Sequence, residues 1–182
     1  YPGCGNTVNC NHPLVTGFIV HCLEYWVAEL GVDGFRFDLA AALARENGRL
    51  KPDGGLLAAM REDPVLGRVK LIAEPWDAAG GSLLGCLPVG WCEWNGEYRD
   101  SVRRFWRGDA GELGRFTSAL AGSSPAYAPS GRGAEASVNF VACHDGPTLA
   151  DLTSYERKHN DANGESNRDG PAESFACNWG VE

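Results

Sequence analysis

The sequence predicts an α/β fold, a partial (β/α)8 TIM barrel made of roughly the middle to late strands. Short apolar segments that read as strands alternate with helical stretches, and strands separated by helices imply a parallel sheet. The acids Asp38, Glu74 and Asp145 each end such a segment and are spaced 36 and 71 residues apart. These spacings are about one and two units of a barrel in which roughly 250 residues form eight units. We therefore expect the acids to follow strands n, n+1 and n+3 and to face one mouth.

The first helix is expected to start at Asn11 as N-cap, because an asparagine side chain can accept from the first free N–H groups. Pro13 suits the first turn, where its missing N–H is not needed. Gly31 stands where a left-handed stop belongs. Apolar residues at helical spacing predict a broad buried face, which comprises Leu14, Phe18, Cys22, Trp26 and Leu30, with Ile19, Leu23 and Val27 beside it.

The remaining elements follow from apolar periodicity and from Gly and Pro punctuation. Strands are expected at residues 32–38, 69–73, 91–94 and 138–143. Helices are expected to begin at residue 39 and to cover residues 56–62, 97–107, 113–120 and 148–155. In the helix at 97–107, Val102, Phe105 and Trp106 are expected to face inward. Residues 47–55, 121–137 and those from His159 onward are polar or rich in Gly, Ser and Pro, and are expected to be loops.

The composition excludes several classes of function. The net charge is −8, from 16 basic and 24 acidic residues, which is unsuited to nucleic acid or to an anionic membrane surface. No stretch approaches the roughly 20 apolar residues of a membrane-spanning helix. The seven cysteines include no pair with CxxC spacing, which disfavours structural zinc and favours free thiols in a reducing compartment over a disulfide framework. A neutral ligand such as a sugar remains compatible with this charge.

Asp38 and Glu74 stand among residues that favour different protonation states. Arg36 and Asp38 point to the same side of their strand, and a neighbouring guanidinium keeps a carboxylate ionised, as a nucleophile requires. Glu74 precedes Pro75 and Trp76; an indole in a closed cleft would desolvate the carboxyl and raise its pKa, as a general acid requires. The structural alternatives are an Arg–Asp pair for Asp38 and hydrogen bonds to loop amides for Glu74.

His144 and Asp145 offer a donor and a carboxylate at one strand edge. Binding of substrate hydroxyl groups is the favoured interpretation. Metal ligation is disfavoured because no further histidine lies at suitable spacing, so no cofactor is expected. Two carboxyls in contrasting environments define a glycosidase pair, and aromatic rings can stack on sugars; Trp76 and Tyr1 are the candidates here.

Several motifs give the chain a resemblance to the isoamylase-type glycogen and starch debranching enzymes of the alpha-amylase superfamily. The segments at 32–38, 73–77 and 138–145 resemble the motifs that carry the nucleophile, the acid/base and the third carboxylate. Those at 3–13, 93–100 and 159–165 are similar to the isoamylase subgroup in particular. The similarity spans nearly the whole chain.

The resemblance implies a retaining hydrolase of α-1,6 branch linkages in glycogen or amylopectin. Asp38 would be the nucleophile and Glu74 the acid/base. Asp145 and His144 would hold ring hydroxyls, and Arg36 would position Asp38. It also implies a reducing compartment, a plastid in a plant or alga or the cytoplasm in a bacterium, and it admits homo-oligomers or hetero-oligomers with other debranching subunits.

Compared with the family, residues 1–182 are expected to be a fragment of one catalytic barrel domain. An earlier Asp…Asn-His motif, the early and last strands, the N-terminal sandwich and the C-terminal domain are expected to lie outside it. A barrel with open sheet edges is unstable, so the isolated segment is expected to fold poorly and to be inactive. Pro147 replaces a usual aromatic and the stretch 43–68 looks short, which leaves the branch-length preference open.

The sequence is also compatible with two other functions. One is a non-catalytic glucan-binding subunit of a debranching complex, which should have lost catalytic acids, whereas Asp38, Glu74 and Asp145 are all present. The other is a different hydrolase or transglycosylase of the same superfamily. The three acids do not separate this last alternative from debranching, but the subgroup motifs do.

Overall fold

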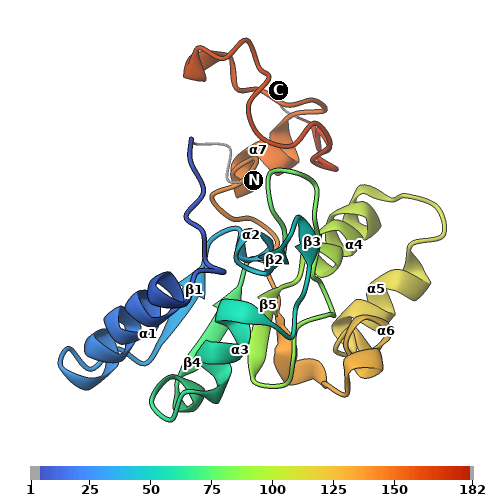
Figure 1. Cartoon of the computed structure of the whole chain (residues 1–182). Coiled ribbons are helices and arrows are strands. Elements are labelled where there is room, and N and C mark those ends of the chain that lie inside the picture. The colour runs from blue at the N-terminus through green and yellow to red at the C-terminus, as the bar shows by residue number, and fades with distance from the viewer. Residues whose placement is uncertain (1–4, 181–182) are drawn as a thin grey trace. The chain divides into compact units, whose positions relative to one another are not determined.

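The computed structural model of the protein describes residues 5–180. The chain forms two compact units. Unit 1 comprises Tyr1–Trp94 and Pro125–Val138, and unit 2 comprises Asn95–Ser124 and Asn139–Glu182. The elements in chain order (Figure 1) are α1 Pro13–Ala28, β1 Gly34–Phe37, α2 Ala40–Leu43, β2 Arg45–Glu46, β3 Arg49–Leu50, α3 Gly55–Glu62, β4 Lys70–Ala73, β5 Trp91–Trp94, α4 Gly96–Arg107, α5 Leu113–Leu120, α6 Ser124–Tyr127, β6 Ser137–Val138 and α7 Leu149–Ser154.

Unit 1 is built on a parallel sheet with the strand order β1-β4-β5-β6. Neighbours in the sheet follow one another along the chain, apart from the small β2–β3 hairpin inserted after β1. Consecutive parallel strands joined by crossovers are the pattern of a barrel wall. The predicted fold class is therefore confirmed: the chain forms part of a (β/α)8 barrel, with the expected strands n to n+3.

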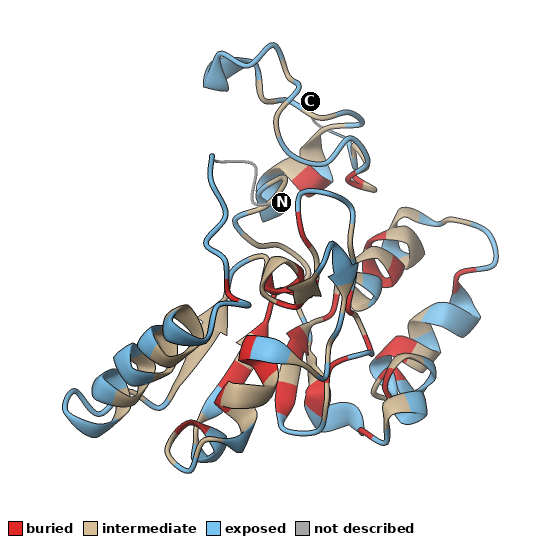
Figure 2. Ribbon diagram, in the orientation of Figure 1, coloured by how far each residue is buried: buried red, intermediate tan, exposed pale blue. Residues whose placement is uncertain are grey.

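One face of the sheet forms the core of unit 1 (Figure 2). Side chains alternate along strands, so Leu71 and Ala73 of β4 lie on the same face as Trp91 of β5, and all three are buried. Leu56, Leu57 and Met60 of α3 join this cluster, and its further buried members include Leu66, Leu83 and Leu87. The opposite face of the strands is less buried and carries Arg36, Ile72 and Trp94.

Helix α1 packs by only one edge of the broad face that was predicted, the edge that carries Ile19, Leu23 and Val27. Ile19, Val20, Leu23 and Val27 contact the core, whereas the rest of the expected face is exposed and Cys22 is not buried: the exposed residues are Leu14, Phe18, Cys22, Trp26 and Leu30. Apolar residues cover most of the circumference of α1, so their periodicity does not single out a face. The cap also differs. His12 caps α1 through Nδ1, while the Asn11 side chain donates to the Arg45 carbonyl at 2.8 Å.

Three further expectations are corrected. The strand expected at 138–143 is only Ser137–Val138; further on, the Val141 carbonyl accepts from the Arg103 guanidinium. Trp106 was expected to face inward but is 66% exposed, because Phe105 instead stacks on Phe116 at 4.0 Å between ring centroids. The expected loop at 121–137 contains α6 and two 3-10 turns.

Other predicted elements are confirmed. The strands before Glu74 and at 91–94 and the helices at 56–62, 97–107 and 113–120 lie where the sequence indicated. Thr148 forms a capping box with Asp151 at the start of α7. Among the residues that the structure describes, no helix is both long and apolar enough to cross a membrane.

The core of unit 1 gives a stability prediction. Leu57 is fully buried, so Leu57→Ala is expected to lower the free energy of unfolding by about 2–5 kcal/mol, through lost burial and the cavity left behind. Val89→Ala is the control, because Val89 is 65% exposed, and it should have little effect. Equilibrium urea unfolding of both variants of the full-length protein checks this, and equal effects would contradict the assignment of the core.

Candidate active site

Asp38 and Glu74 follow adjacent parallel strands at the same level of the sheet. The register pairs Phe37 of β1 with Ala73 of β4, so the next residue on each strand is one of the two acids. Arg36 joins them: its Nη1 donates to Asp38, and its Nη2 lies 2.7 Å from Glu74 Oε1. The predicted pairing of Arg36 with Asp38 on one side of the strand is confirmed.

The two carboxyls differ sharply in exposure. The Asp38 side chain is 64% exposed and that of Glu74 is 1% exposed. The second oxygen of Glu74, Oε2, accepts from the backbone N–H of Leu39 at 2.7 Å. Leu39 has a left-handed backbone, with φ 46° and ψ 46°, which is unusual for a leucine. This strained turn after β1 aims a backbone donor at the carboxyl, and strain of this kind concentrates at functional sites.

Trp94 also belongs to this group, although sequence reasoning did not select it. The register places Ile72 opposite Cys92, so Trp94 stands at the level of Glu74 on the neighbouring strand. The Arg36 guanidinium lies 4.3 Å from the centroid of its ring. A guanidinium over an indole gains cation–π attraction. Trp94 therefore holds in place the guanidinium that bridges the two acids. Two signals in the sequence could have identified Trp94: it stands at the end of a predicted strand, and strand alternation puts it on the same face as Cys92.

Trp76 follows β4 in a loop that folds back on itself. Trp76 and Ser82 form an antiparallel bridge, and the Leu83 N–H donates to the Pro75 carbonyl at 2.6 Å. Asp77 pins this turn: its Oδ1 accepts from the N–H groups of Ala79 and Gly81 at 3.0 and 2.9 Å. Trp76 is half-buried and thus keeps accessible surface in the loop that follows Glu74.

The pKa of Asp77 is set by opposing influences. Burial raises it, but the hydrogen bond from Arg45 and the backbone donors of Gly81 and Ala79 outweigh burial, so the net pKa is below the ordinary value of 3.8. A carboxyl with a lowered pKa stabilises the folded state above its unfolded pKa and loses that contribution as the pH falls through the folded pKa.

A pH-dependent loss of stability is therefore expected for Asp77→Asn. The variant should be less stable than the wild type near neutral pH, and the difference should shrink as the pH falls below about 4, where the wild-type carboxyl also becomes neutral. Urea unfolding across this range measures the difference. The exposed Asp53→Asn is the matched control, and a deficit that did not vary with pH would contradict the ionised pair.

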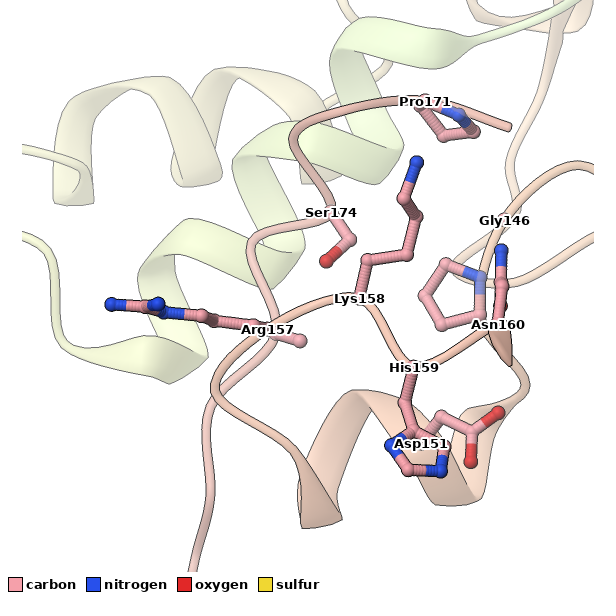
Figure 3. Close-up of a pocket in the computed structure, with 10 residues that line it drawn as sticks. Gly146, Asp151, Arg157, Lys158, His159, Asn160, Pro171 and Ser174 are labelled. Carbon is pink, nitrogen blue, oxygen red and sulfur yellow. The ribbon is translucent and has the colours of Figure 1, made fainter. Parts of the chain in front are cut away.

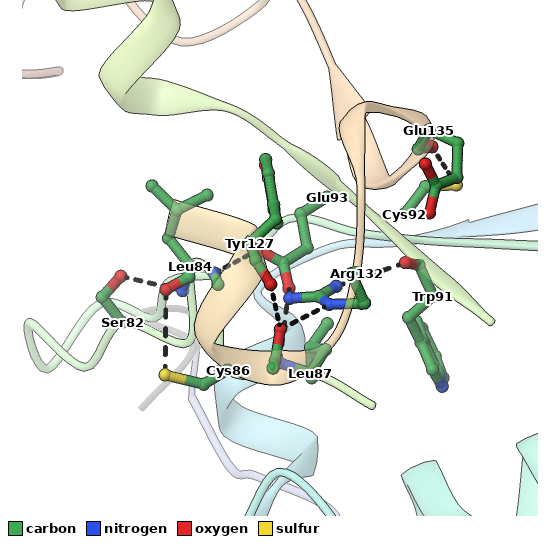
Figure 4. Close-up of polar contacts among 12 residues, drawn as sticks. Ser82, Leu84, Cys86, Leu87, Trp91, Cys92, Glu93, Tyr127, Arg132 and Glu135 are labelled. Atoms are coloured by element: carbon green, nitrogen blue, oxygen red, sulfur yellow. Dashed lines mark hydrogen bonds and ion pairs between the residues drawn. The ribbon is translucent and has the colours of Figure 1, made fainter. Parts of the chain in front are cut away.

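The end of the same loop is held by a second buried carboxylate (Figure 4). Glu93 of β5 is fully buried and accepts from the N–H of Gly85 at 2.7 Å and from Arg132 Nη2 at 2.7 Å. Arg132 also donates to the Trp91 carbonyl and lies over the Tyr127 ring. Burial raises the pKa of Glu93 despite these donors. The pair serves to join the 82–90 loop to the 125–136 segment.

His144 and Asp145 lie in unit 2 and are described within it. His144 Nε2 is 3.6 Å from Asp145 Oδ1, and both side chains are about half exposed. Their segment is fastened by Arg103 of α4, which is 7% exposed and donates to the Val141 carbonyl through Nε and Nη2 and to the Ser174 carbonyl through Nη1. Arg103 was not singled out from the sequence, where it is one of several arginines on a helix.

A small pocket in unit 2 lies directly after His144 and Asp145 (Figure 3). Its walls are Gly146 and Pro147, Asp151 of α7, the 157–160 segment, and Pro171, Ser174 and Ala176. The polar loop from His159 onward, expected as a loop, is ordered by its own side chains: Asn160 N donates to Asn167 Oδ1, Asn167 Nδ2 to the Lys158 carbonyl, and Asn163 Nδ2 to Asp169 Oδ2. Amide side chains thus order this segment around its one short 3-10 helix, Asp161–Asn163.

The structure brings Arg36, Asp38 and Glu74 together in unit 1, with Trp76 in the loop that follows. His144 and Asp145 form their own pair in unit 2. The other aromatic candidate, Tyr1, and the start of the motif at 3–13 lie outside the described residues. The cysteines of the described part of the chain are free thiols, at positions 10, 22, 86, 92, 143 and 177.

The fold and the paired acids define a class of protein: a (β/α)8 barrel with carboxyl groups at the C-terminal ends of its strands, where barrel enzymes carry their active sites. Solved structures that resemble the chain include the type I pullulanase of Bacillus subtilis str. 168 complexed with maltose, at TM-score 0.64 and 28% identity, over 82% of this chain and 23% of that one. The pullulanase of Anoxybacillus sp. LM18-11 complexed with maltotriose gives TM-score 0.59 and 29% identity, over 83% and 23%.

Curated relatives name the group more closely. The chain is 51% identical to a glycogen operon protein GlgX homolog of Mycobacterium bovis over all of its length and 25% of the relative. It is 48% identical to the chloroplastic isoamylase SU1 of Zea mays (26% of the relative) and 47% identical to a glycogen debranching enzyme of Klebsiella pneumoniae (28%). The resemblance to isoamylase-type debranching enzymes is confirmed. The chain spans about a quarter of the length of these relatives, and no family model matches it.

Proposed function

We propose that the chain carries catalytic groups of a retaining glycoside hydrolase that cleaves α-1,6 branch linkages in glycogen or amylopectin. The observation that carries this proposal is the bridge made by Arg36 between an exposed Asp38 and a buried Glu74 at adjacent strand ends. Two carboxyls held close together, with different environments, suit a nucleophile and an acid/base, which retaining enzymes place about 5–5.5 Å apart. The similarity to debranching enzymes and isoamylases supports the choice of substrate.

In the first step, an oxygen of Asp38 attacks the anomeric carbon of the branch, and the bond from that carbon to the O6 of the main-chain glucose breaks. Glu74 gives its proton to this departing O6, so that the main chain leaves as a neutral alcohol. The product on the enzyme is a glycosyl ester of Asp38. In the second step, Glu74 takes a proton from water, the water oxygen attacks the same carbon, and the ester breaks with net retention.

The contacts of Glu74 impose a requirement on this cycle. Both of its oxygens are engaged, one by Arg36 and one by the Leu39 N–H. Donation of a proton to the glycosidic oxygen therefore requires the contact with Arg36 to open when substrate enters. Arg36 keeps its hydrogen bond to Asp38 and its place over Trp94 in the meantime, and so continues to hold the nucleophile in position.

His144, Asp145 and Trp76 supply substrate contacts in this proposal. The half-exposed imidazole and carboxylate of His144 and Asp145 can donate to and accept from ring hydroxyls. The accessible ring of Trp76 offers a flat apolar face to a glucose unit. Residues 1–182 form part of one catalytic barrel domain of a longer protein in this proposal, and a reducing compartment, such as a plastid or bacterial cytoplasm, suits the free thiols. Association with other copies or debranching subunits stays a prediction.

The test is to incubate the full-length protein with amylopectin and, separately, with linear amylose. We expect new reducing ends and short linear chains from amylopectin, and none from amylose. Cleavage of amylose would indicate an α-1,4 hydrolase. Chain transfer without a gain in reducing ends would indicate a transglycosylase. Glucan binding without release of chains by a folded protein would indicate a non-catalytic subunit.

A further inference from the structure

Two loops meet near the paired acids and are tied together by a buried ion pair. Arg45 stands at the start of the β2–β3 hairpin, in the loop that follows Asp38, and Asp77 stands in the loop that follows Glu74. Arg45 Nε donates to Asp77 Oδ2 at 2.7 Å, and the two side chains are 14% and 0% exposed.

The Arg45 side of the tie is itself held in place. Its Nη1 donates to the Gly48 carbonyl at 2.9 Å, which closes the hairpin on the guanidinium. Its backbone carbonyl accepts from Asn11 Nδ2 at 2.8 Å, and the Lys51 N–H donates to the neighbouring Ala44 carbonyl. The guanidinium is therefore presented to Asp77 from a fixed backbone.

The tie leads to Glu74 along two routes. Along the chain, Asp77 is three residues from Glu74, and one of the intervening residues is Pro75, whose φ is fixed by its ring. Across the two loops, the N–H of Ala40 donates to the Glu74 carbonyl at 2.9 Å, and the N–H of Leu39 donates to its side chain. The loop after β1 therefore contacts Glu74 directly, through the N–H groups of Leu39 and Ala40, and contacts the segment after Glu74 through the Arg45–Asp77 pair.

The space around the pair is filled. A Cβ atom added at Gly81 would lie 2.6 Å from Arg45 Nη2 and 3.1 Å from each carboxylate oxygen of Asp77. These distances leave no room for a methyl group unless the guanidinium moves. A methyl group at Gly81 therefore displaces the guanidinium, which makes Gly81 a second, charge-neutral site from which the pair can be disturbed.

We propose that Arg45 is a positioning residue for the branch-cleaving reaction: by holding Asp77, it fixes the Glu74–Asp77 segment so that the acid/base carboxyl meets the departing glucosyl oxygen. This inference rests on the proposed function. The other end of the same loop is held separately by Glu93 and Arg132, so loss of Arg45 releases only the end next to Glu74. A displacement of about 1 Å at a reacting group can cost about 100-fold in rate.

The test uses a substrate whose cleavage needs no proton donor. Fluoride leaves an α-maltotriosyl fluoride without general acid, whereas the sugar oxygen of amylopectin requires it. In the full-length protein, Arg45→Met is expected to lower kcat on amylopectin about 10- to 100-fold and kcat on the fluoride less than about threefold. Gly81→Ala should also lower kcat on amylopectin more than kcat on the fluoride, but by a smaller factor. Arg45→Lys should lower kcat on amylopectin less than Arg45→Met does. Arg49→Met, an exposed arginine on the same hairpin, should change neither rate.

Equal losses on both substrates, measured per active site by trapping of the glycosyl-enzyme, would overturn the proposal and leave Arg45 a structural residue. So would an Arg45→Met protein with unchanged rates. If Arg45→Met does not fold, Arg45→Lys and Gly81→Ala decide the question by the same ratio. A wild-type protein that cleaves neither substrate would refute the proposed function itself. The wild-type rates are measured before any variant is made, so this outcome is distinguished from a failure of the inference about Arg45.

Discussion

Asp38→Asn is expected to abolish the release of linear chains from amylopectin, with kcat lower by about 10⁴-fold or more, the order found when a catalytic nucleophile is removed. The amide is isosteric with the carboxylate but cannot form the glycosyl ester. It also loses the negative charge that pairs with Arg36. The measurement is the initial rate of reducing-end formation, together with mass spectrometry for a covalent sugar on the protein.

The control for this variant is Asp53→Asn, which makes the same chemical change at an exposed residue and should leave the rate unchanged. Because the Asp38 side chain is largely exposed, the variant should keep the wild-type melting midpoint. An Asp38→Asn protein that is folded and retains a tenth of the activity would refute the assignment of Asp38 as nucleophile.

Glu74→Gln is expected to separate the two halves of the reaction. Cleavage of amylopectin should fall by about 10²- to 10⁴-fold, the usual contribution of a general acid. Formation of the glycosyl-enzyme from α-maltotriosyl fluoride should be nearly unaffected, since fluoride leaves without a proton. Its hydrolysis should be slow, because no base activates water, so the covalent intermediate on Asp38 should accumulate.

Azide sharpens this test, since it needs no general base to attack the glycosyl-enzyme. Added azide is expected to restore turnover of the fluoride and to give the α-glycosyl azide. Glu62→Gln, at an exposed glutamate, is the matched control. Equal losses of glycosyl-enzyme formation on both substrates, or no response to azide, would argue that Glu74 is structural and would move the acid/base role to another residue.

The burial of Glu74 shows what local sequence could not supply. The sequence suggested Trp76 as the indole that surrounds this carboxyl, on the basis of adjacency in the chain. In the structure, the carboxyl contacts Arg36 and the Leu39 N–H, and Trp94 acts through Arg36. These partners come from β1 and β5, on either side of β4, and only strand order and register bring them together.

The helices show the same division. The start of α7 was predictable because its capping box joins Thr148 to Asp151 within one turn. The cap of α1 was not, because Asn11 is engaged by Arg45, 34 residues away. The sequence included Ile19, Leu23 and Val27 in the predicted face of α1 but could not separate them from the exposed Leu14, Phe18 and Trp26, since apolar side chains surround most of that helix and the neighbouring elements decide which of them are covered.

The sequence by itself determined the alternation of strands and helices, the positions of Asp38 and Glu74 at strand ends, and the common side of the strand taken by Arg36 and Asp38. These features follow from periodicities of two or 3.6 residues and from the breaks that Gly and Pro impose. Tertiary structure alone decided which side chains pair across the loops, as in Arg45–Asp77, Glu93–Arg132 and Arg103 with the Val141 carbonyl. Such pairs depend on close approach of segments that are distant along the chain, and a buried charge must be satisfied by whatever partner that approach provides.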